Sequence, residues 1–187
     1  MNIKEEKSFL RKTTIDKLKR QTTKERVAKS AAIAEKILVS RDYLEGQTIM
    51  FYAAMIYEVE TKELILDALK RKKTVVLPAM KRNTNNIILC HIKDLEEDTN
   101  LCEYGFLEPK NSIWGNVEAK DIDVVYIPGI CFDERNNRLG RGAAYYDKFL
   151  SSLRSDTKKI GIAFDLQLVD HVPAEAHDIV LDYVVTN

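Results

Sequence analysis

The segment from residue 123 to residue 150 constrains the fold more than any other part of the chain, because it joins a strand, a loop and a helix. Its first part, residues 124–127 (VVYI), is an apolar run typical of a buried strand. Pro128 and Gly129 then interrupt the regular backbone, and residues 133–137 are polar turn formers. An apolar helical face begins at Phe149 and Leu150. A buried strand that leads through a loop into a helix is typical of α/β proteins.

The loop between this strand and this helix combines two arginines with two glycines: Arg138, Gly140, Arg141 and Gly142. Glycine lets backbone N–H groups approach an oxyanion closely, and a helix N-terminus adds partial positive charge. Arginine presents a planar fork of donors that suits phosphate oxygens. The spacing matches neither the P-loop nor GxGxxG. Two interpretations stay open here, a loop that binds phosphate or a nucleotide, and a surface loop that needs glycines to turn and arginines for solubility.

Length and composition narrow the class of protein. The chain has 187 residues, enough for one domain with a substantial core, so we expect a single domain over residues 1–187. The formal net charge of +0 argues against a nucleic-acid-binding protein. The sequence has no stretch of about 18 consecutive apolar residues, so we expect no transmembrane helix. The charged N-terminal residues lack the apolar core of a signal peptide. The three cysteines have no metal-like spacing and are expected to be reduced. We therefore expect a cytoplasmic protein without membrane or nucleic-acid partners, a monomer or at most a weak homodimer.

Strands alternate with helices along the chain. Helical spacing covers residues 4–39, with a break at residues 21–25 where Thr22 or Thr23 caps a second helix. The acidic run at residues 94–100 is interpreted as a solvated loop and not as a metal site. This alternation predicts a single three-layer α/β/α domain with a mostly parallel sheet. The predicted strands cover residues 48–54, 74–78, 86–91, 123–128, 159–164 and 183–186, and the further helices cover residues 60–72 and 143–153.

Ligands of parallel sheets bind at the carboxyl ends of the strands. Polar residues follow the predicted strands here, and we expect them to converge: Glu58, Lys81, Arg82, Asp133, Asp165 and His171. For Glu58 two roles stay open, a carboxylate in the first turn of a helix and an acceptor for an aminopyrimidine edge. Glu108 and Pro109 are expected to form a plain turn.

Asp147 and Asp178 are candidate ligands of Mg²⁺, which takes few carboxylates and completes its shell with water and phosphate oxygens. A helix cap or a surface position is the alternative for each of them.

Taken together, these motifs resemble the 5-formyltetrahydrofolate cyclo-ligase family over essentially the whole chain. The most specific element is PGxxFD followed by NRLGRGxxYYD, which spans residues 128–147. The resemblance also rests on residues 7–11 (KSFLR), residues 58–61 (EVET), Glu108-Pro109, Val172-Pro173 and His177-Asp178.

The resemblance implies a three-layer α/β enzyme that uses ATP and Mg²⁺ to convert 5-formyltetrahydrofolate to 5,10-methenyltetrahydrofolate, releasing ADP and phosphate. In the family mechanism the formyl oxygen attacks the γ-phosphate, and N10 then closes the ring. By position, ATP would be contacted by Lys7, Ser8, Phe9, Leu10 and Arg11, and by Arg138, Leu139, Gly140, Arg141, Gly142, Ala143, Ala144, Tyr145 and Tyr146. Asp147 and Asp178 would hold the metal, Ala53, Met55, Glu58 and Tyr145 would line the folate pocket, and Arg138, Arg141 and Tyr145 would serve catalysis.

The chain departs from the family at Ala144, where glycine is usual, and at Ala143, where glycine is frequent. An added methyl group matters wherever the backbone must approach a phosphate closely or take a positive φ. Two alternatives therefore stand beside the ligase. One is a regulator that binds folate or a nucleotide with weakened turnover. The other is a related ATP-dependent ligase that acts on another formyl or amide substrate.

Overall fold

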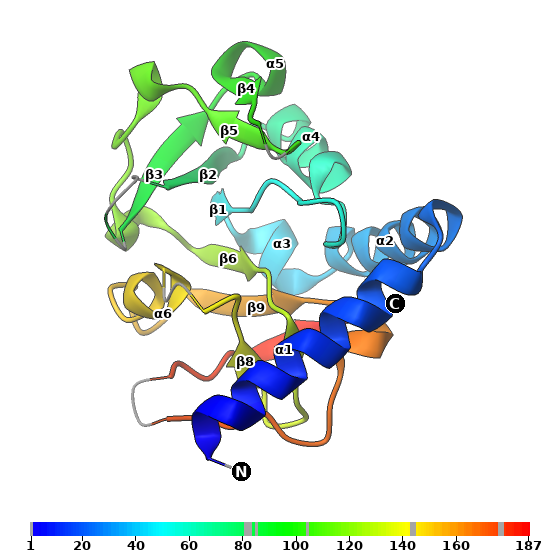
Figure 1. The fold of residues 1–187 in the computed structure, drawn as a ribbon. Helices are drawn as coiled ribbons and strands as arrows, with labels where there is room; N and C mark the ends of the chain where they lie inside the picture. The colour runs from blue at the N-terminus through cyan, green and yellow to red at the C-terminus, as the bar shows by residue number, and fades with distance from the viewer. Residues whose placement is uncertain (1, 81–83, 85, 104, 143–144, 176–177) are drawn as a thin grey trace.

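A six-stranded sheet forms the centre of the computed structural model, which describes residues 2–80, 84, 86–103, 105–142, 145–175 and 178–187 (Figure 1). The strand order is β10-β9-β6-β1-β2-β3, and every neighbouring pair is parallel except β2 and β3. The connection from Met80 to Ile87 is too short for a parallel crossover, so this pair is antiparallel. The predicted mostly parallel sheet is confirmed. Its strands are β1 (Thr48–Met50), β2 (Thr74–Met80), β3 (Ile87–Ile92), β6 (Val124–Ile127), β9 (Lys158–Ile162) and β10 (Tyr183–Val185).

Side chains that alternate along the strands build a separate core on each face of the sheet. In β1, Ile49 joins the core beneath helix α2 (Thr23–Leu38), whereas the next residue, Met50, joins the core beneath helix α6 (Tyr145–Leu150). Helix α4 (Lys62–Lys70) contributes Leu64 to the first core. Helices therefore cover both faces, as expected for three layers, with α2 and α4 on one side of the sheet and α6 on the other (Figure 1).

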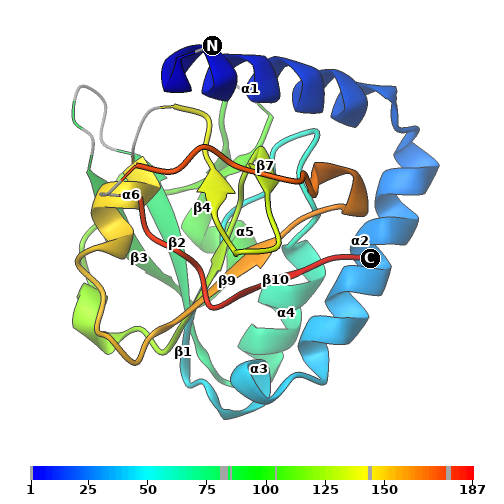
Figure 2. The same cartoon turned by 90° about the horizontal axis from the view of Figure 1, so that it is seen from below.

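The break between the first two helices lies where the sequence predicts it. Helix α1 (Ile3–Arg20) ends before Gln21, and Thr22 caps α2 by accepting from the backbone N–H of Glu25. The Glu25 carboxylate accepts in return from the Thr22 N–H, which completes a capping box. This abrupt break lets α1 leave the direction of α2 and lie over the hairpin of β7 (Cys131–Phe132) and β8 (Arg138–Leu139), as Figure 2 shows.

Several predicted boundaries are wrong, and each has a local cause. The first strand ends at Met50 and not at residue 54, because the chain then turns away to form the loop of residues 51–61. Helix α4 begins at Lys62, since the Thr61 hydroxyl donates to the Tyr52 carbonyl instead of capping the helix. Asp94 caps the short helix α5 (Leu95–Asp98), so the acidic run is not a plain loop.

The segment between the sheet strands β3 and β6 contains small elements that sequence periodicity missed. Glu108-Pro109 belongs to strand β5 (Leu107–Pro109), which pairs antiparallel with β4 (Thr99–Leu101), so the expected plain turn is wrong. The shortness of these elements leaves no periodic pattern to detect. The remaining elements are β4 (Thr99–Leu101), β5 (Leu107–Pro109), helix α3 (Arg41–Glu45), and the 3₁₀ turns Asn111–Ile113, Ala119–Asp121 and Asp165–Gln167. In the part of the chain that the structure describes, none of the helices has the length and apolar character needed to cross a bilayer.

The β7–β8 hairpin is closed by the buried carboxylate of Asp133. Its Oδ1 accepts from the backbone N–H groups of Arg135 and Asn137, and its Oδ2 accepts from the Asn137 amide and the Val172 N–H, all at 2.9–3.0 Å. Burial alone would raise the pKa of Asp133, but the hydrogen bonds from Asn137, Val172 and Arg135 outweigh it and lower the pKa. The carboxylate is thus a structural anchor.

We expect Asp133→Asn to destabilise the fold near neutral pH by about 3 kcal/mol, because an amide cannot accept all of these N–H groups. The folded-state pKa of Asp133 is lowered, so its contribution is complete above the unfolded pKa of about 3.9 and is lost as pH falls through the folded value. Urea unfolding should therefore show a difference from wild type that is constant down to about pH 5 and shrinks at lower pH. Asp170→Asn, at an exposed position of the neighbouring segment, is the control. A difference that grows on acidification would contradict this account.

Candidate active site

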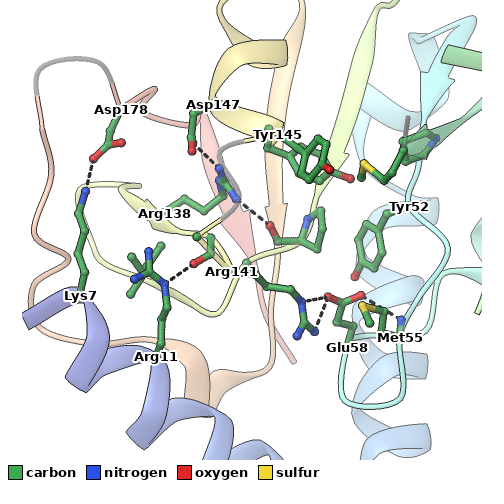
Figure 3. A pocket seen from close by; sticks show the side chains of 18 of the residues that line it. Lys7, Arg11, Tyr52, Met55, Glu58, Arg138, Arg141, Tyr145, Asp147 and Asp178 are labelled. Carbon is green, nitrogen blue, oxygen red and sulfur yellow. Dashed lines mark hydrogen bonds and ion pairs between the residues drawn. The ribbon is translucent and has the colours of Figure 1, made fainter. Parts of the chain in front are cut away.

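One cavity of about 590 Å³ opens at the carboxyl ends of β1, β2 and β6. Tyr52 and Ala53 reach it from the end of β1, Met80 from β2, and Pro128 and Gly129 from the end of β6. Helix α1, strand β5 and the glycine loop, whose described part is residues 140–142 after β8, complete its walls (Figure 3). This is the edge at which a parallel sheet binds its ligands.

Arg138 is the most firmly held cation of the cavity. Its side chain is only 4% exposed, and its Nη2 donates to Asp147 Oδ1 at 2.5 Å. Its Nη1 donates to the Pro128 carbonyl at 3.4 Å, and its guanidinium lies 5.5 Å from the centre of the Tyr146 ring. These contacts join β8, the end of β6 and the start of α6, so Arg138 has a fixed position in the wall.

Helix α1 supplies three further cations at successive helical turns, Lys4, Lys7 and Arg11. Arg11 Nε donates to the Gly140 carbonyl at 2.9 Å, and Lys7 Nζ donates to Glu175 at 2.8 Å and Asp178 at 3.0 Å. Burial alone would lower the pKa of Lys7, but its two carboxylate partners outweigh burial and raise it, so Lys7 stays charged.

The resemblance implies that all of residues 7–11 contact ATP, but of this stretch only Lys7 and Arg11 line the cavity. Ser8 and Phe9 point away from the cavity, and the Phe9 side chain is 58% exposed. Leu10 packs against Leu139 and Val172 beneath the hairpin. The reason is helical geometry, since only residues three or four apart share a face, and the sequence motif does not reveal which face that is.

The glycine loop follows β8 and carries Arg141. Gly142 has φ +103, a backbone conformation that residues with a side chain rarely adopt, so glycine is favoured at this position. Leu139, Gly140, Gly142, Tyr145 and Tyr146 also line the cavity. Ala143 and Ala144 lie outside the described residues.

Glu58 lies on the opposite side of the cavity from α1, in the loop of residues 51–61. Its side chain is 12% exposed, and its Oε2 accepts from the Met55 backbone N–H at 3.0 Å. Arg141 Nε and Nη2 both donate to Glu58 Oε1, at 3.2 and 2.9 Å. The first-turn role considered for Glu58 is wrong, because α4 begins only at Lys62. The Tyr52 hydroxyl donates to the Val59 carbonyl and so holds this loop in place.

Apolar side chains form the wall next to Glu58. Tyr52 was not among the candidates although it directly precedes Ala53, and Pro78 was placed only at the end of a strand. The alternation of apolar residues along a strand is the same whether they face a cavity or a core, so it does not mark Met80 as a wall residue. Phe106 lies in the turn before β5, where the sequence has no periodic pattern. The residues of this wall are Tyr52, Ala53, Met55, Pro78, Met80, Phe106, Leu107 and Tyr145.

Asp147 and Asp178 both line the cavity, each next to a cation. Asp147 pairs with Arg138 and Asp178 with Lys7. Among the described residues, no group of three or more His, Cys, Asp or Glu side chains could hold a metal. Two carboxylates in a cavity that also holds several cations fit the chemistry of Mg²⁺, which takes few carboxylates and draws its other ligands from water or phosphate oxygens.

Other polar residues predicted to converge here do not reach the cavity. Asp133 is the hairpin anchor, and Asp165 pairs with Lys29 at 2.5 Å. His171 is 65% exposed and lies 4.0 Å from Asp133. These side chains follow strands in sequence, but their loops turn away from the carboxyl edge. Lys81 and Arg82 lie outside the described residues.

Comparisons with known proteins agree with this arrangement. A curated 5-formyltetrahydrofolate cyclo-ligase from Mus musculus is 28% identical over 195 residues, covering 96% of this chain and 92% of the mouse protein. The solution structure of Aquifex aeolicus 5,10-methenyltetrahydrofolate synthetase matches with a TM-score of 0.81 and 28% identity, covering 96% of this chain and 88% of that one. The 5,10-methenyltetrahydrofolate synthetase structure from Mycoplasma pneumoniae matches with a TM-score of 0.76 and 26% identity, covering 96% and 98% of the two chains.

The match to the family itself extends over residues 3–187, and thus includes α1, the Glu58 loop, the glycine loop and the segment with Asp178. Every wall of the cavity is inside the matched region. The chain therefore belongs to the 5-formyltetrahydrofolate cyclo-ligase family.

Proposed function

We propose that this protein uses ATP to convert 5-formyltetrahydrofolate to 5,10-methenyltetrahydrofolate, with release of ADP and phosphate. The observation that carries the proposal is that a single cavity has a cationic, glycine-rich wall beside an apolar wall with a shielded carboxylate. The first wall suits a polyphosphate, and the second suits an aromatic heterocycle with a donor edge. Membership of the family supports the choice of this reaction.

In this proposal the nucleotide phosphates lie against Lys7, Arg11, Arg138 and Arg141. Lys7 and Arg138 are held by carboxylates, and Arg11 is held by the Gly140 carbonyl. Such preorganised cations stabilise charge that develops during phosphoryl transfer without having to reorient.

The folate lies on the other side of the cavity. Its aminopyrimidine edge presents parallel N–H donors, and Glu58 is the carboxylate placed to accept them. Ala53, Met55 and Tyr145 provide the adjoining surface. Burial of the heterocycle in this wall would exclude water from the formyl group.

The chemistry requires positioning more than a nucleophilic side chain. The formyl oxygen forms a bond to the γ-phosphorus while the bond from that phosphorus to the ADP oxygen breaks. This step converts the formyl oxygen into a leaving group and makes the formyl carbon electrophilic. N10 then bonds to that carbon and loses its proton, and phosphate departs with the former formyl oxygen. Arg138 and Arg141 are proposed to stabilise the transferred phosphoryl group, with Tyr145 between the two substrates.

Mg²⁺ belongs to this proposal, with Asp147 and Asp178 as the residues that would hold it. When bound, it would neutralise phosphate charge next to the cationic wall. We also propose that the protein works in the cytoplasm as a monomer, with a weak homodimer as the alternative, and without nucleic-acid partners. The balanced net charge of +0 supports the last point.

The protein should form the methenyl product from 5-formyltetrahydrofolate only when MgATP is present, because the formyl oxygen must be phosphorylated before the ring can close. Absorbance of the methenyl product over time measures this. ATP without folate and folate without ATP are the controls. A folded protein that binds ATP but yields no product would instead favour the regulator or a ligase with another substrate.

Glu58→Gln should lower kcat/KM for the folate by about 10- to 100-fold, since a charged acceptor of two hydrogen bonds becomes a neutral one. KM for ATP should change little, because Glu58 lies on the folate side of the cavity. Steady-state kinetics with each substrate varied in turn distinguishes these effects. Glu63→Gln, at an exposed site in the first turn of α4, is the matched control. Equal losses for both substrates would argue against a folate-specific role.

Asp147→Asn should raise the Mg²⁺ concentration for half-maximal activity by about tenfold or more, because one carboxylate ligand is lost. Activity measured over a Mg²⁺ titration at fixed ATP gives this value. Asp156→Asn, an exposed aspartate away from the cavity, is the control. An unchanged Mg²⁺ requirement with a lower kcat would mean that Asp147 does not bind the metal and acts only by holding Arg138 in place.

A further inference from the structure

Arg138 of β8 and Arg141 of the glycine loop differ in how many contacts hold their side chains. Arg138 is almost fully buried and contacts Asp147, Pro128 and Tyr146. Arg141 is 48% exposed, and the only partner found for its side chain within the described residues is Glu58. An ion pair with one half-exposed member contributes little free energy, so Arg141 can exchange Glu58 for another partner.

The pair of Arg141 and Glu58 matters because it occupies hydrogen-bond acceptor positions of the Glu58 carboxylate. An ionised carboxylate offers about four acceptor positions. Three are occupied here, two on Oε1 by Arg141 Nε and Nη2 and one on Oε2 by the Met55 N–H. A flat donor edge with two parallel N–H groups needs a free position on each oxygen. Glu58 cannot receive such an edge while Arg141 occupies both positions of Oε1.

Nucleotide phosphates would compete for Arg141. The loop also contains Gly140 and Gly142, and Lys7, Arg11 and Arg138 line the same cavity. A phosphate accepts the two parallel N–H groups of a guanidinium as a carboxylate does, and it carries more negative charge. A polyphosphate in this wall therefore favours transfer of Arg141 from Glu58 to phosphate oxygens.

We propose that Arg141 blocks Glu58 until the nucleotide draws its guanidinium away, so that nucleotide binding opens the folate site. This exchange rests on the proposed function, and it adds a coupling between the two substrates. Because linkage is reciprocal, folate strengthens nucleotide binding by the same factor.

The test is calorimetric titration of 5-formyltetrahydrofolate into the protein, alone and with saturating Mg²⁺ and a non-hydrolysable imido analogue of ATP. In wild type the analogue should tighten folate binding by about fivefold, at the low end of coupling between sites, because a weak ion pair leaves a fraction of Glu58 unblocked. Arg141→Met keeps an unbranched, flexible side chain but has no donors. It should bind folate without nucleotide about as tightly as wild type binds it with the analogue, and the analogue should add nothing further.

Two further variants separate the exchange from a general loss of charge or of folding. Arg135→Met removes an exposed arginine of the same hairpin outside the cavity and should keep the wild-type coupling. Arg141→Lys keeps a cation that can still pair with Glu58. Without nucleotide, it should therefore bind folate more weakly than Arg141→Met but more tightly than wild type. A structural role for Arg141 would weaken folate binding in every condition, with no gain in the absence of nucleotide.

The outcomes also separate this inference from the proposed function. If wild type forms product but Arg141→Met shows no tighter folate binding without nucleotide, the exchange is wrong and the reaction stands. If wild type neither binds 5-formyltetrahydrofolate nor forms product, both are wrong.

Discussion

The buried guanidinium of Arg138 is the interaction on which the cavity depends. A charge removed from water is tolerated only when it is paired and hydrogen bonded. Arg138 meets this requirement with a carboxylate, a backbone carbonyl and an aromatic face, which come from the start of α6, the end of β6 and Tyr146. It thereby ties strand β8 to the start of α6 and the end of β6. Gly140 and Arg141, which follow shortly after in the chain, extend from this immobilised residue.

The charges around the cavity compensate each other. Lys7 pairs with Asp178 and Glu175, Arg138 with Asp147, and Arg141 with Glu58. These pairs hold the side chains in place before a ligand arrives, but they differ in how easily they can be exchanged. The side chains of Lys7 and Arg138 are largely shielded from water, although Glu175 is 44% exposed, whereas the Arg141 side chain itself is 48% exposed. Arg141 is therefore the cation of these three that separates most readily from its partner.

Residue patterns predicted the architecture well and the small elements poorly. The alternation of apolar residues in the strands and the break at Thr22 were correct, because burial on a sheet face and helix capping are local effects. The strand that contains Glu108 was missed, since pairing with β4 depends on a partner that its short sequence does not specify. Of the residues that line the cavity, Lys7, Arg11, Glu58 and residues 138–142 are among the predicted candidates, whereas Met80 and Phe106 are not. Apolar residues that face a cavity have the same pattern as those that face a core.

The sequence by itself determined the fold class and the chemistry available to the protein. Its strand and helix periodicities specify an α/β fold with a mostly parallel sheet, and its arginine–glycine segment supplies cations and a flexible backbone, because these properties depend on residue type and local spacing. Tertiary structure alone decided which polar residues meet. It brought Glu58 to Arg141 and Lys7 to Asp178, and it kept Asp133, Asp165 and His171 outside the cavity. The physical reason is that loop direction and helix facing follow from long-range packing and charge pairing, which no local pattern records.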